Sequence, residues 1–209
     1  MNKTVYALIF LISILYSYSI ENEASLEQTP ESFKVLFKTS KGEFVVEAHK
    51  KWSPLAVQRF YNLVKDDYYR NLPLFRVVDG FVAQFGLGGN LVKQNKWDVN
   101  FQDEPVIHSN LRRTIAFARA GNNTRSNQIY INYSDNIRLD DYKSEGLDVV
   151  GYPPFAKVIS GMEVVDSFFN EYGNEPSQFQ DLISTYGNDW ILERYPKLDM
   201  ILSAELIKK

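Results

Sequence analysis

Cysteine is absent from this chain of 209 residues, and histidine occurs only twice. The absence of cysteine excludes a disulfide framework, thiolate catalysis, a thiolate metal site and a lipid-anchored lipoprotein. The two histidines, His49 and His108, lie far apart without a neighbouring carboxylate pattern, so we expect surface residues rather than metal ligands. The sequence therefore predicts neither a metal nor a cofactor.

An excess of basic residues is also missing, because the formal net charge is −3 at pH 7. Proteins that bind nucleic acid carry a basic patch, so we predict no nucleic-acid partner. A composition of 44% hydrophobic and 14% aromatic residues suits one globular domain with a sizeable core. Nothing in the sequence signals oligomerisation, and we expect a monomer.

The first residues have the three parts of a secretory signal peptide. Lys3 makes the start basic, residues 4–16 form an uncharged apolar run, and residues 17–19 fit a cleavage site. A membrane-crossing helix needs roughly 20 residues, more than this run provides, so we expect cleavage after Ser19 rather than an anchor. The protein is then exported, to a periplasm, a secretory lumen or the outside, with no stable membrane insertion.

The rest of the chain divides into a leader and one domain. After the signal peptide at residues 1–19, residues 20–32 are polar and acidic, which predicts a flexible leader. The folded domain is expected to span residues 33–209.

Alternating apolar and polar residues predict many short strands in this domain. Residues 33–38 and 43–48 flank a glycine-containing turn, which is typical of a β-hairpin. Ser53 as N-cap and Pro54 at the first helical position predict a helix, and a second helix is expected over residues 161–169. Further strands are expected at residues 114–119, 128–133, 155–159 and 200–207. With no βαβ rhythm, this order favours a closed antiparallel barrel capped by helices.

The most informative stretch is residues 75–86, FRVVDGFVAQFG, because a short apolar strand pair here carries both an arginine and a glutamine. With a turn at Gly80, alternation places Arg76 and Gln84 on one face of neighbouring strands, beside Phe81. The sequence thus predicts a cationic donor and an amide set against an aromatic wall.

This stretch resembles the signature of the cyclophilin-type peptidyl-prolyl cis-trans isomerases, which read Phe-His-Arg-Val, then Gly-Phe, then Gln-Gly-Gly. It lacks the usual histidine before Arg76, and Phe85 stands where a glycine is common. The resemblance extends over residues 33–165, with the segments in the family's order. It implies a mainly β fold, a closed eight-stranded antiparallel barrel with an α-helix over each end.

The resemblance also implies a function, the acceleration of rotation about X-Pro bonds in proline-containing polypeptides without a cofactor. Arg76 matches the family's catalytic arginine, and Gln84 matches the glutamine that orients the arginine or the substrate carbonyl. At the position of Arg119 the family holds the substrate with backbone groups, so the side chain of Arg119 is expected to face outward. The positions that match substrate-binding residues are Phe81, Val82, Ala118, Arg119, Gln128, Tyr130, Leu139 and Tyr152.

Two departures from the family pattern carry expectations of their own. Arg138 stands where the family has a tryptophan that governs cyclosporin binding, which predicts weak cyclosporin binding. Residues 151–156 look like the corresponding segment of bacterial-type cyclophilins, which also lack the pocket histidine. Activity is therefore expected to survive the loss of that histidine.

Two functions other than an isomerase remain open at this point. The chain could be a catalytically weak module that binds proline peptides, or a lipocalin-type carrier, which would need an open barrel lumen. If it is an isomerase, its expected service is the folding of other exported proteins.

Residues 172–197 could pack against the barrel or bind a partner, and packing is the favoured interpretation.

Overall fold

The computed structural model describes residues 29–141 and 151–208. The predicted signal peptide and most of the predicted leader, up to residue 28, lie outside the described residues. Within the described part, no helix has the length and apolar character that crossing a membrane requires.

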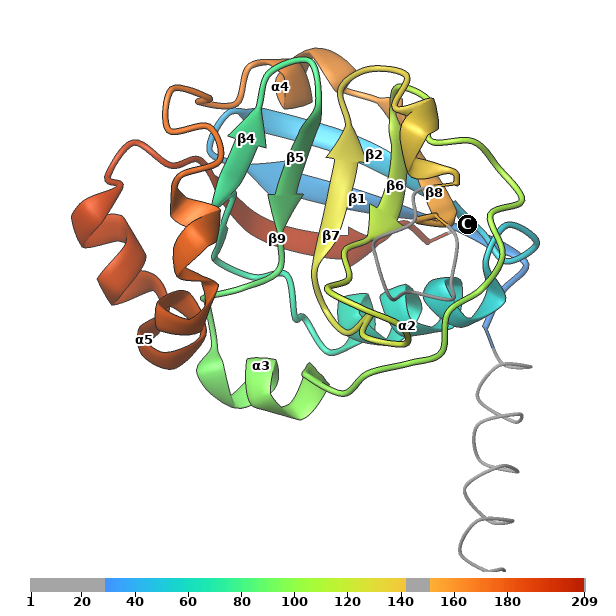
Figure 1. Cartoon of the computed structure of the whole chain (residues 1–209), viewed down its shortest axis with the longest axis horizontal. Coiled ribbons are helices and arrows are strands. Elements are labelled where there is room, and N and C mark those ends of the chain that lie inside the picture. Colours follow the sequence, from blue (N-terminus) through green and yellow to red (C-terminus); the bar gives the residue numbers. More distant parts are fainter. Residues whose placement is uncertain (1–28, 142–150, 209) are drawn as a thin grey trace, which may run out of the picture.

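One curled antiparallel sheet forms the centre of the molecule (Figure 1). Its strand order is β3-β9-β1-β2-β8-β6-β7-β5-β4. The strands are β1 (Ser32–Thr39), β2 (Gly42–His49), β3 (Leu72–Pro73), β4 (Arg76–Val78), β5 (Val82–Phe85), β6 (Thr114–Phe117), β7 (Ile129–Asn132), β8 (Pro154–Ser160) and β9 (Met200–Leu206).

The predicted closed barrel of eight strands is wrong, because the sheet has nine strands and its two edges, β3 and β4, do not pair. The strand β3 has only two residues, and Pro73 has no backbone N–H to offer a neighbour. The edge of β4 is covered instead by the C-terminal segment, since the N–H of Val77 donates to the carbonyl of Gly173 at 3.3 Å. The sheet is an open half-barrel.

The predicted hairpin is confirmed as β1 and β2, which pair from Ser32 opposite His49 to Thr39 opposite Gly42. Gly42 has φ of 134°, a backbone conformation that side-chain-bearing residues rarely adopt. The hydroxyl of Thr39 donates to the carbonyl of Gly42 at 2.8 Å. Strand alternation and a glycine at the turn are thus sufficient to place this hairpin.

Four α-helices are present in the described residues, where two were expected. They are α2 (Pro54–Lys65), α3 (Leu91–Trp97), α4 (Met162–Asp166) and α5 (Gln180–Arg194), with 3₁₀ turns η1 (Ile137–Leu139) and η2 (Pro176–Phe179). The predicted helices correspond to α2 and α4, which lie over opposite ends of the curled sheet (Figure 1). The helix α5 was missed because Gly187, with φ of 66°, breaks the helical repeat within it.

The start of α2 is capped by a residue far away in the sequence. Ser53 stands at the N-cap position, but its side chain makes no capping bond to the helix backbone. The carboxylate of Glu104 instead accepts from the N–H of Leu55 at 2.7 Å and of Ala56 at 3.2 Å, and it accepts from the Ser53 hydroxyl. The expected serine cap is therefore replaced by a buried carboxylate on the positive end of the helix.

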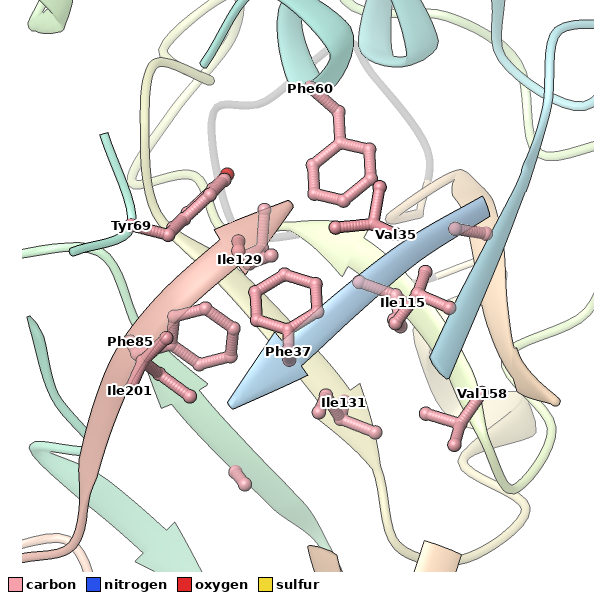
Figure 2. Packing of buried hydrophobic residues seen from close by; sticks show 14 of the residues in the cluster. Val35, Phe37, Phe60, Tyr69, Phe85, Ile115, Ile129, Ile131, Val158 and Ile201 are labelled. Atoms are coloured by element: carbon pink, nitrogen blue, oxygen red, sulfur yellow. The ribbon is translucent and has the colours of Figure 1, made fainter. Parts of the chain in front are cut away.

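Side chains fill the interior of the sheet. Phe37 stacks on Phe44 with ring centroids 4.9 Å apart, and Phe60 reaches in from α2 toward it (Figure 2). Tyr69, Phe85 and the aliphatic residues of β6, β7 and β9 complete this cluster. The open lumen that a lipocalin-type carrier requires is absent from the described structure.

The C-terminal segment packs against the side of the sheet. Ile183 and Ile191 of α5 form a second apolar cluster with Phe75 and Leu87, closed by Tyr195. The expectation that residues 172–197 pack against the barrel is confirmed.

Candidate active site

A pocket of about 420 Å³ lies on the outer face of β4, β5, β6 and β7, and is closed by η1 and the start of α5. Nine of the ten predicted site residues line this pocket, and the tenth, Gln128, hydrogen-bonds to two of the lining side chains. The lining residues are Arg76, Phe81, Val82, Gln84, Ala118, Arg119, Tyr130, Arg138, Leu139, Tyr152 and Gln180.

Strand register brings the central residues of the pocket together. Arg76 of β4 lies opposite Gln84 of β5, Gln84 lies opposite Tyr130 of β7, and Tyr130 lies opposite Ala116 of β6. Residues directly opposite one another in antiparallel strands project to the same face of a sheet. One row across four strands therefore builds the base of the pocket.

A chain of hydrogen bonds orients the guanidinium of Arg76. Its Nη1 donates to Gln84 Oε1 at 3.0 Å, and Gln84 Nε2 donates to Gln128 Oε1 at 2.9 Å. Gln128 Nε2 then donates to Gln180 Oε1 at 3.0 Å. Each glutamine side chain accepts with its oxygen on one side and donates with its nitrogen on the other. This row of hydrogen bonds therefore fixes which way each side-chain amide points, from α5 to Arg76.

Arg76 is half-buried, and desolvation lowers the pKa of its guanidinium. An arginine nevertheless remains charged throughout the range in which proteins work. Its Nη2 makes no hydrogen bond to any residue in the described part of the chain. The site thus holds a charged donor that a substrate group can engage.

The apolar floor of the pocket consists of Val82, Ala116, Tyr130 and Leu139, with Tyr152 packed against them. The Tyr130 hydroxyl donates to Asn110 Oδ1 at 2.9 Å, and burial raises the pKa of Tyr130 well above its ordinary value. Tyr130 therefore stays neutral at working pH, and the floor suits an apolar ring.

Asn110 was not predicted from the sequence, and it links the floor to the surrounding loops. Its Nδ2 donates to Asp140 Oδ1 at 2.8 Å and to the carbonyl of Tyr152 at 2.9 Å, while its Oδ1 accepts from Tyr130. Residue 110 belongs to a polar loop without a motif, so no local signal marks it.

The expectation that the Arg119 side chain faces outward is wrong. The side chain is only 1% exposed and lies 3.4 Å from Asp103, while its Nη2 donates to the carbonyl of Gly151 at 2.7 Å. Arg125 lies beside it, 3.3 Å from Asp103 and 3.2 Å from Glu104. Two carboxylates thus compensate two buried guanidiniums, which is what permits Arg119 to turn inward.

Arg138 and Arg76 share one aromatic ring. The Arg138 guanidinium carbon lies 4.7 Å from the centroid of Phe81, and that of Arg76 lies 5.4 Å from it. Such distances correspond to cation–π contacts. Phe81 therefore separates a fixed cation within the pocket from an exposed cation at its rim.

The two histidines lie outside this pocket. Trp52 stacks on both of them, with ring centroids 4.5 Å from His49 and 3.9 Å from His108. His108 is exposed as expected, whereas His49 is half-buried, and desolvation lowers its pKa. In residues 29–141 and 151–208, no group of three or more potential ligands could hold a metal ion.

Fold and pocket together define a class of protein, a β-rich scaffold with a pocket between a charged donor and an apolar floor. The model of the family described as cyclophilin type peptidyl-prolyl cis-trans isomerase matches residues 34–187. The chain belongs to this family and is a peptidyl-prolyl cis-trans isomerase of cyclophilin type.

Relatives and solved structures agree with this assignment. Peptidyl-prolyl cis-trans isomerase B of Escherichia coli is 30% identical over 177 residues, which cover 84% of this chain and 99% of the relative. Peptidyl-prolyl cis-trans isomerase A of Dickeya dadantii is 28% identical over the full length of both chains.

A cyclophilin type isomerase of Cryptosporidium parvum has a similar fold, with a TM-score of 0.61 and 20% identity over 85% of this chain and 99% of that chain. A second structure of that protein was determined in the presence of the dipeptide Ala-Pro, with a TM-score of 0.60 over 84% of this chain.

Proposed function

We propose that Arg76 is the catalytic residue and that it stabilises the twisted X-Pro amide, while the apolar floor holds the proline ring. The observation that carries this proposal is the row of Arg76, Gln84 and Tyr130, which sets a charged, oriented donor beside Val82 and Leu139. A related fold studied with Ala-Pro supports proline as the occupant.

The chemistry requires no covalent step. Rotation about an X-Pro bond crosses a barrier of about 18–20 kcal/mol, because amide resonance is lost in the twisted state. The twisted nitrogen regains a lone pair, to which the unengaged donor of Arg76 gives a hydrogen bond. A bond made only in the transition state lowers the barrier without tightening ground-state binding.

Gln84 acts as a positioning residue. Its amide oxygen holds Arg76 Nη1 at 3.0 Å, so the guanidinium is oriented before the substrate arrives. The hydrogen bond that the oriented Arg76 gives to the twisted amide forms only in the transition state, and a hydrogen bond to a charged group contributes about 1.5–3 kcal/mol, roughly 10- to 150-fold in rate.

The test of the catalytic role is an isomerisation assay on a short X-Pro peptide, with the wild type compared with Arg76→Ala and Arg76→Lys. We expect Arg76→Ala to lower kcat/KM by about 100-fold and Arg76→Lys to restore only part of it, because lysine lacks the planar fork. Equal melting temperatures would show that the variants are folded. If Arg76→Ala kept the wild-type rate, the assignment of Arg76 would be wrong.

The cellular service that we propose is assistance to the folding of exported proteins, in a periplasm, a secretory lumen or outside the cell. It is supported by the signal-peptide pattern of residues 1–19 and by the slowness of uncatalysed proline isomerisation, about 10–100 s. A fusion of residues 1–32 to a reporter enzyme tests the export step. Retention of the reporter inside the cell would remove this part of the proposal.

Weak cyclosporin binding and a monomeric state belong to the same proposal. Arg138 is exposed at the rim of the pocket, where the family's tryptophan would offer a flat apolar surface. Titration should therefore give a higher Kd for cyclosporin than in a family member that has the tryptophan. The substitution Arg138→Trp should lower this Kd. Light scattering of the mature protein should give the mass of one chain.

A further inference from the structure

The pocket concentrates positive charge in a protein that is acidic overall. The chain has a formal net charge of −3, yet three arginines and no carboxylate occur among the described residues that line the pocket. The three are Arg76, Arg119 and Arg138. Low-dielectric walls strengthen the field of such a cluster at the position of a bound substrate.

Among the described residues, carboxylates compensate one of these three charges. Arg119 lies 3.4 Å from Asp103, and its side chain is 1% exposed, so a substrate cannot reach it. Neither Arg76 nor Arg138 has a carboxylate within ion-pair distance in residues 29–141 and 151–208. Two cations therefore face the substrate with no anionic partner in the part of the chain that the structure describes.

Both of these cations lie against the aromatic ring of Phe81. Both guanidinium carbons contact the same ring, at 5.4 Å for Arg76 and 4.7 Å for Arg138. The Nη1 of Arg76 is held by Gln84 and its Nε is buried, whereas Arg138 is exposed at the rim, so the guanidinium of Arg138 is the one that a carboxylate can engage. Neighbouring residues of a peptide are about 3.8 Å apart at Cα, so a proline at Arg76 places the flanking side chain within reach of Arg138.

We propose that Arg138 selects substrates with an acidic side chain next to the isomerising bond, so that the preferred peptides carry aspartate or glutamate directly before or after proline. This inference rests on the proposed placement of the proline beside Arg76. The carboxylate binds the exposed guanidinium of Arg138 and lies in the positive field of Arg76. Arg138 is a specificity residue, and Arg76 remains the group that acts on the amide.

The size of the effect follows from the exposure of Arg138. An exposed ion pair is weak and screened by salt, whereas a bidentate carboxylate–arginine pair held against a ring is stronger. We expect an acidic flanking residue to raise kcat/KM by about 3- to 10-fold over its uncharged isostere.

The test compares matched peptides by exchange NMR, which needs no coupling protease. The pairs are acetyl-Ala-Glu-Pro-Ala-amide with its Gln analogue, and acetyl-Ala-Ala-Pro-Glu-amide with its Gln analogue. For each pair the measured quantity is the ratio of kcat/KM for the Glu peptide to that for the Gln peptide. The ratio cancels any general effect of a variant on turnover.

The variants are Arg138→Gln, Arg138→Glu and the control Lys51→Gln. Lys51 is exposed and does not line the pocket, and its substitution changes the net charge of the protein as much as Arg138→Gln does. The ratio of at least one pair should exceed about 3 in the wild type and in Lys51→Gln, approach 1 in Arg138→Gln and fall below 1 in Arg138→Glu. Raising the salt to about 1 M should lower the wild-type ratio.

Three outcomes are distinguishable. Equal acceleration of Glu and Gln peptides by the wild type, or a ratio that survives in Arg138→Gln, would overturn the selection of acidic substrates while the proposed function stands. No acceleration of any peptide by folded wild-type protein would overturn the proposed function and this inference with it. Loss of the ratio in Lys51→Gln as well would assign the preference to net charge and overturn the role of Arg138.

Discussion

The strands β5, β6 and β7 have two buried faces that differ in chemistry. The inner face carries only apolar residues, Ala83, Phe85, Ile115, Phe117, Ile129 and Ile131, and belongs to the main core. The outer face carries Val82, Gln84, Thr114, Ala116, Tyr130 and Asn132, all of them buried as well. Equal burial on the two faces therefore has two different physical origins.

On the outer face, burial depends on hydrogen bonds. The Asn132 amide donates to Asn110 Oδ1 at 3.2 Å and to the Thr114 hydroxyl at 2.9 Å, and its oxygen accepts from Asn136 at 2.7 Å. Burying such groups without partners would cost about 1–3 kcal/mol each. The inner face sets the stability of the fold, and the satisfied polar groups of the outer face set the chemistry of the pocket.

The largest effect is expected from emptying the inner face. Phe117 is fully buried, and its ring centroid lies 5.1 Å from those of Phe101 and Phe155. Phe117→Ala should lower the free energy of unfolding by about 3–5 kcal/mol, because a cavity is left among close-packed rings. Urea denaturation measures this loss, and the smaller change Phe117→Leu gives a graded control.

The comparison predicts that the fraction of Phe117→Ala that stays folded at low temperature keeps a wild-type kcat/KM. A kcat/KM that fell together with stability, in a variant shown by circular dichroism to be folded, would mean that the two faces are not separable.

The opposite pattern is expected from Gln84 on the outer face. Gln84→Leu keeps the volume but removes the acceptor of Arg76 and the donor to Gln128. We expect kcat/KM to fall by about 10- to 100-fold and the free energy of unfolding to fall by less than in Phe117→Ala. Steady-state kinetics and urea denaturation on the same preparation decide this. A stability loss as large as that of Phe117→Ala would erase the distinction between the faces.

A smaller effect is expected at the far end of the amide chain. Gln180 accepts from Gln128 at 3.0 Å and donates to the carbonyl of Ser177 at 3.2 Å, so it links α5 to the pocket. Gln180→Ala should lower kcat/KM by about 2- to 5-fold, since Gln128 loses one of its anchors while Arg76 keeps its direct contact. In the Gln84→Leu background, adding Gln180→Ala should lower kcat/KM no further, because the row of hydrogen bonds that leads to Arg76 is already interrupted at Gln84. If the two substitutions lowered the log of kcat/KM additively, Gln84 and Gln180 would not act through one row of hydrogen bonds.

Asp66 is a surface carboxylate outside both faces, and it should make the free energy of unfolding depend on pH. Lys96 at 2.9 Å, and then the Trp97 indole at 2.6 Å, hydrogen-bond to Asp66 and hold its pKa below the ordinary value. A depressed folded pKa contributes stability that is present above the unfolded pKa of about 3.9 and is lost as pH falls through the folded pKa. Asp66→Asn should therefore cost about 0.5 kcal/mol at neutral pH and nothing in strong acid.

Thermal unfolding of wild type and Asp66→Asn across the acid range measures that difference. A gap between the two proteins that widened on acidification would reverse the predicted sign.

The smallest pH effect is expected in catalysis itself. Desolvation lowers the pKa of Arg76 and raises that of Tyr130, yet arginine stays charged and the tyrosine stays neutral below the ordinary tyrosine pKa of about 10. The log of kcat/KM should be flat from about pH 6 to pH 9. A sigmoidal step near neutrality would indicate that a titrating group outside the pocket, such as His49, controls the rate.

Local patterns were sufficient for the parts of the site that lie on strands. The alternation of residues 75–86 placed Arg76, Phe81 and Gln84 at one site, and the resemblance added Tyr130 and Leu139 at positions that the structure brings into the same pocket. The period of side chains along a strand is fixed by backbone geometry, so the placement of Arg76 and Gln84 on one face follows from spacing alone.

Residues that depend on a long-range partner could not be placed in this way. Gln180 reaches the pocket across 52 positions from Gln128, and Asn110 holds Tyr130 across 20 positions. Arg119 turns inward because of Asp103, a loop carboxylate that no motif marks. In each case the deciding contact joins segments whose proximity is a result of folding.

The sequence by itself determined the β-rich class and the hairpin of β1 and β2 through periodic spacing, and it determined the family and the residues of the pocket base through the resemblance of its segments to the family. Only the tertiary structure decided that the sheet stays open at β3 and β4, that α5 completes the pocket and that Arg76 and Arg138 share Phe81. The physical reason is that edges, caps and charge neighbours are set by chain segments that meet only after the sheet has curled.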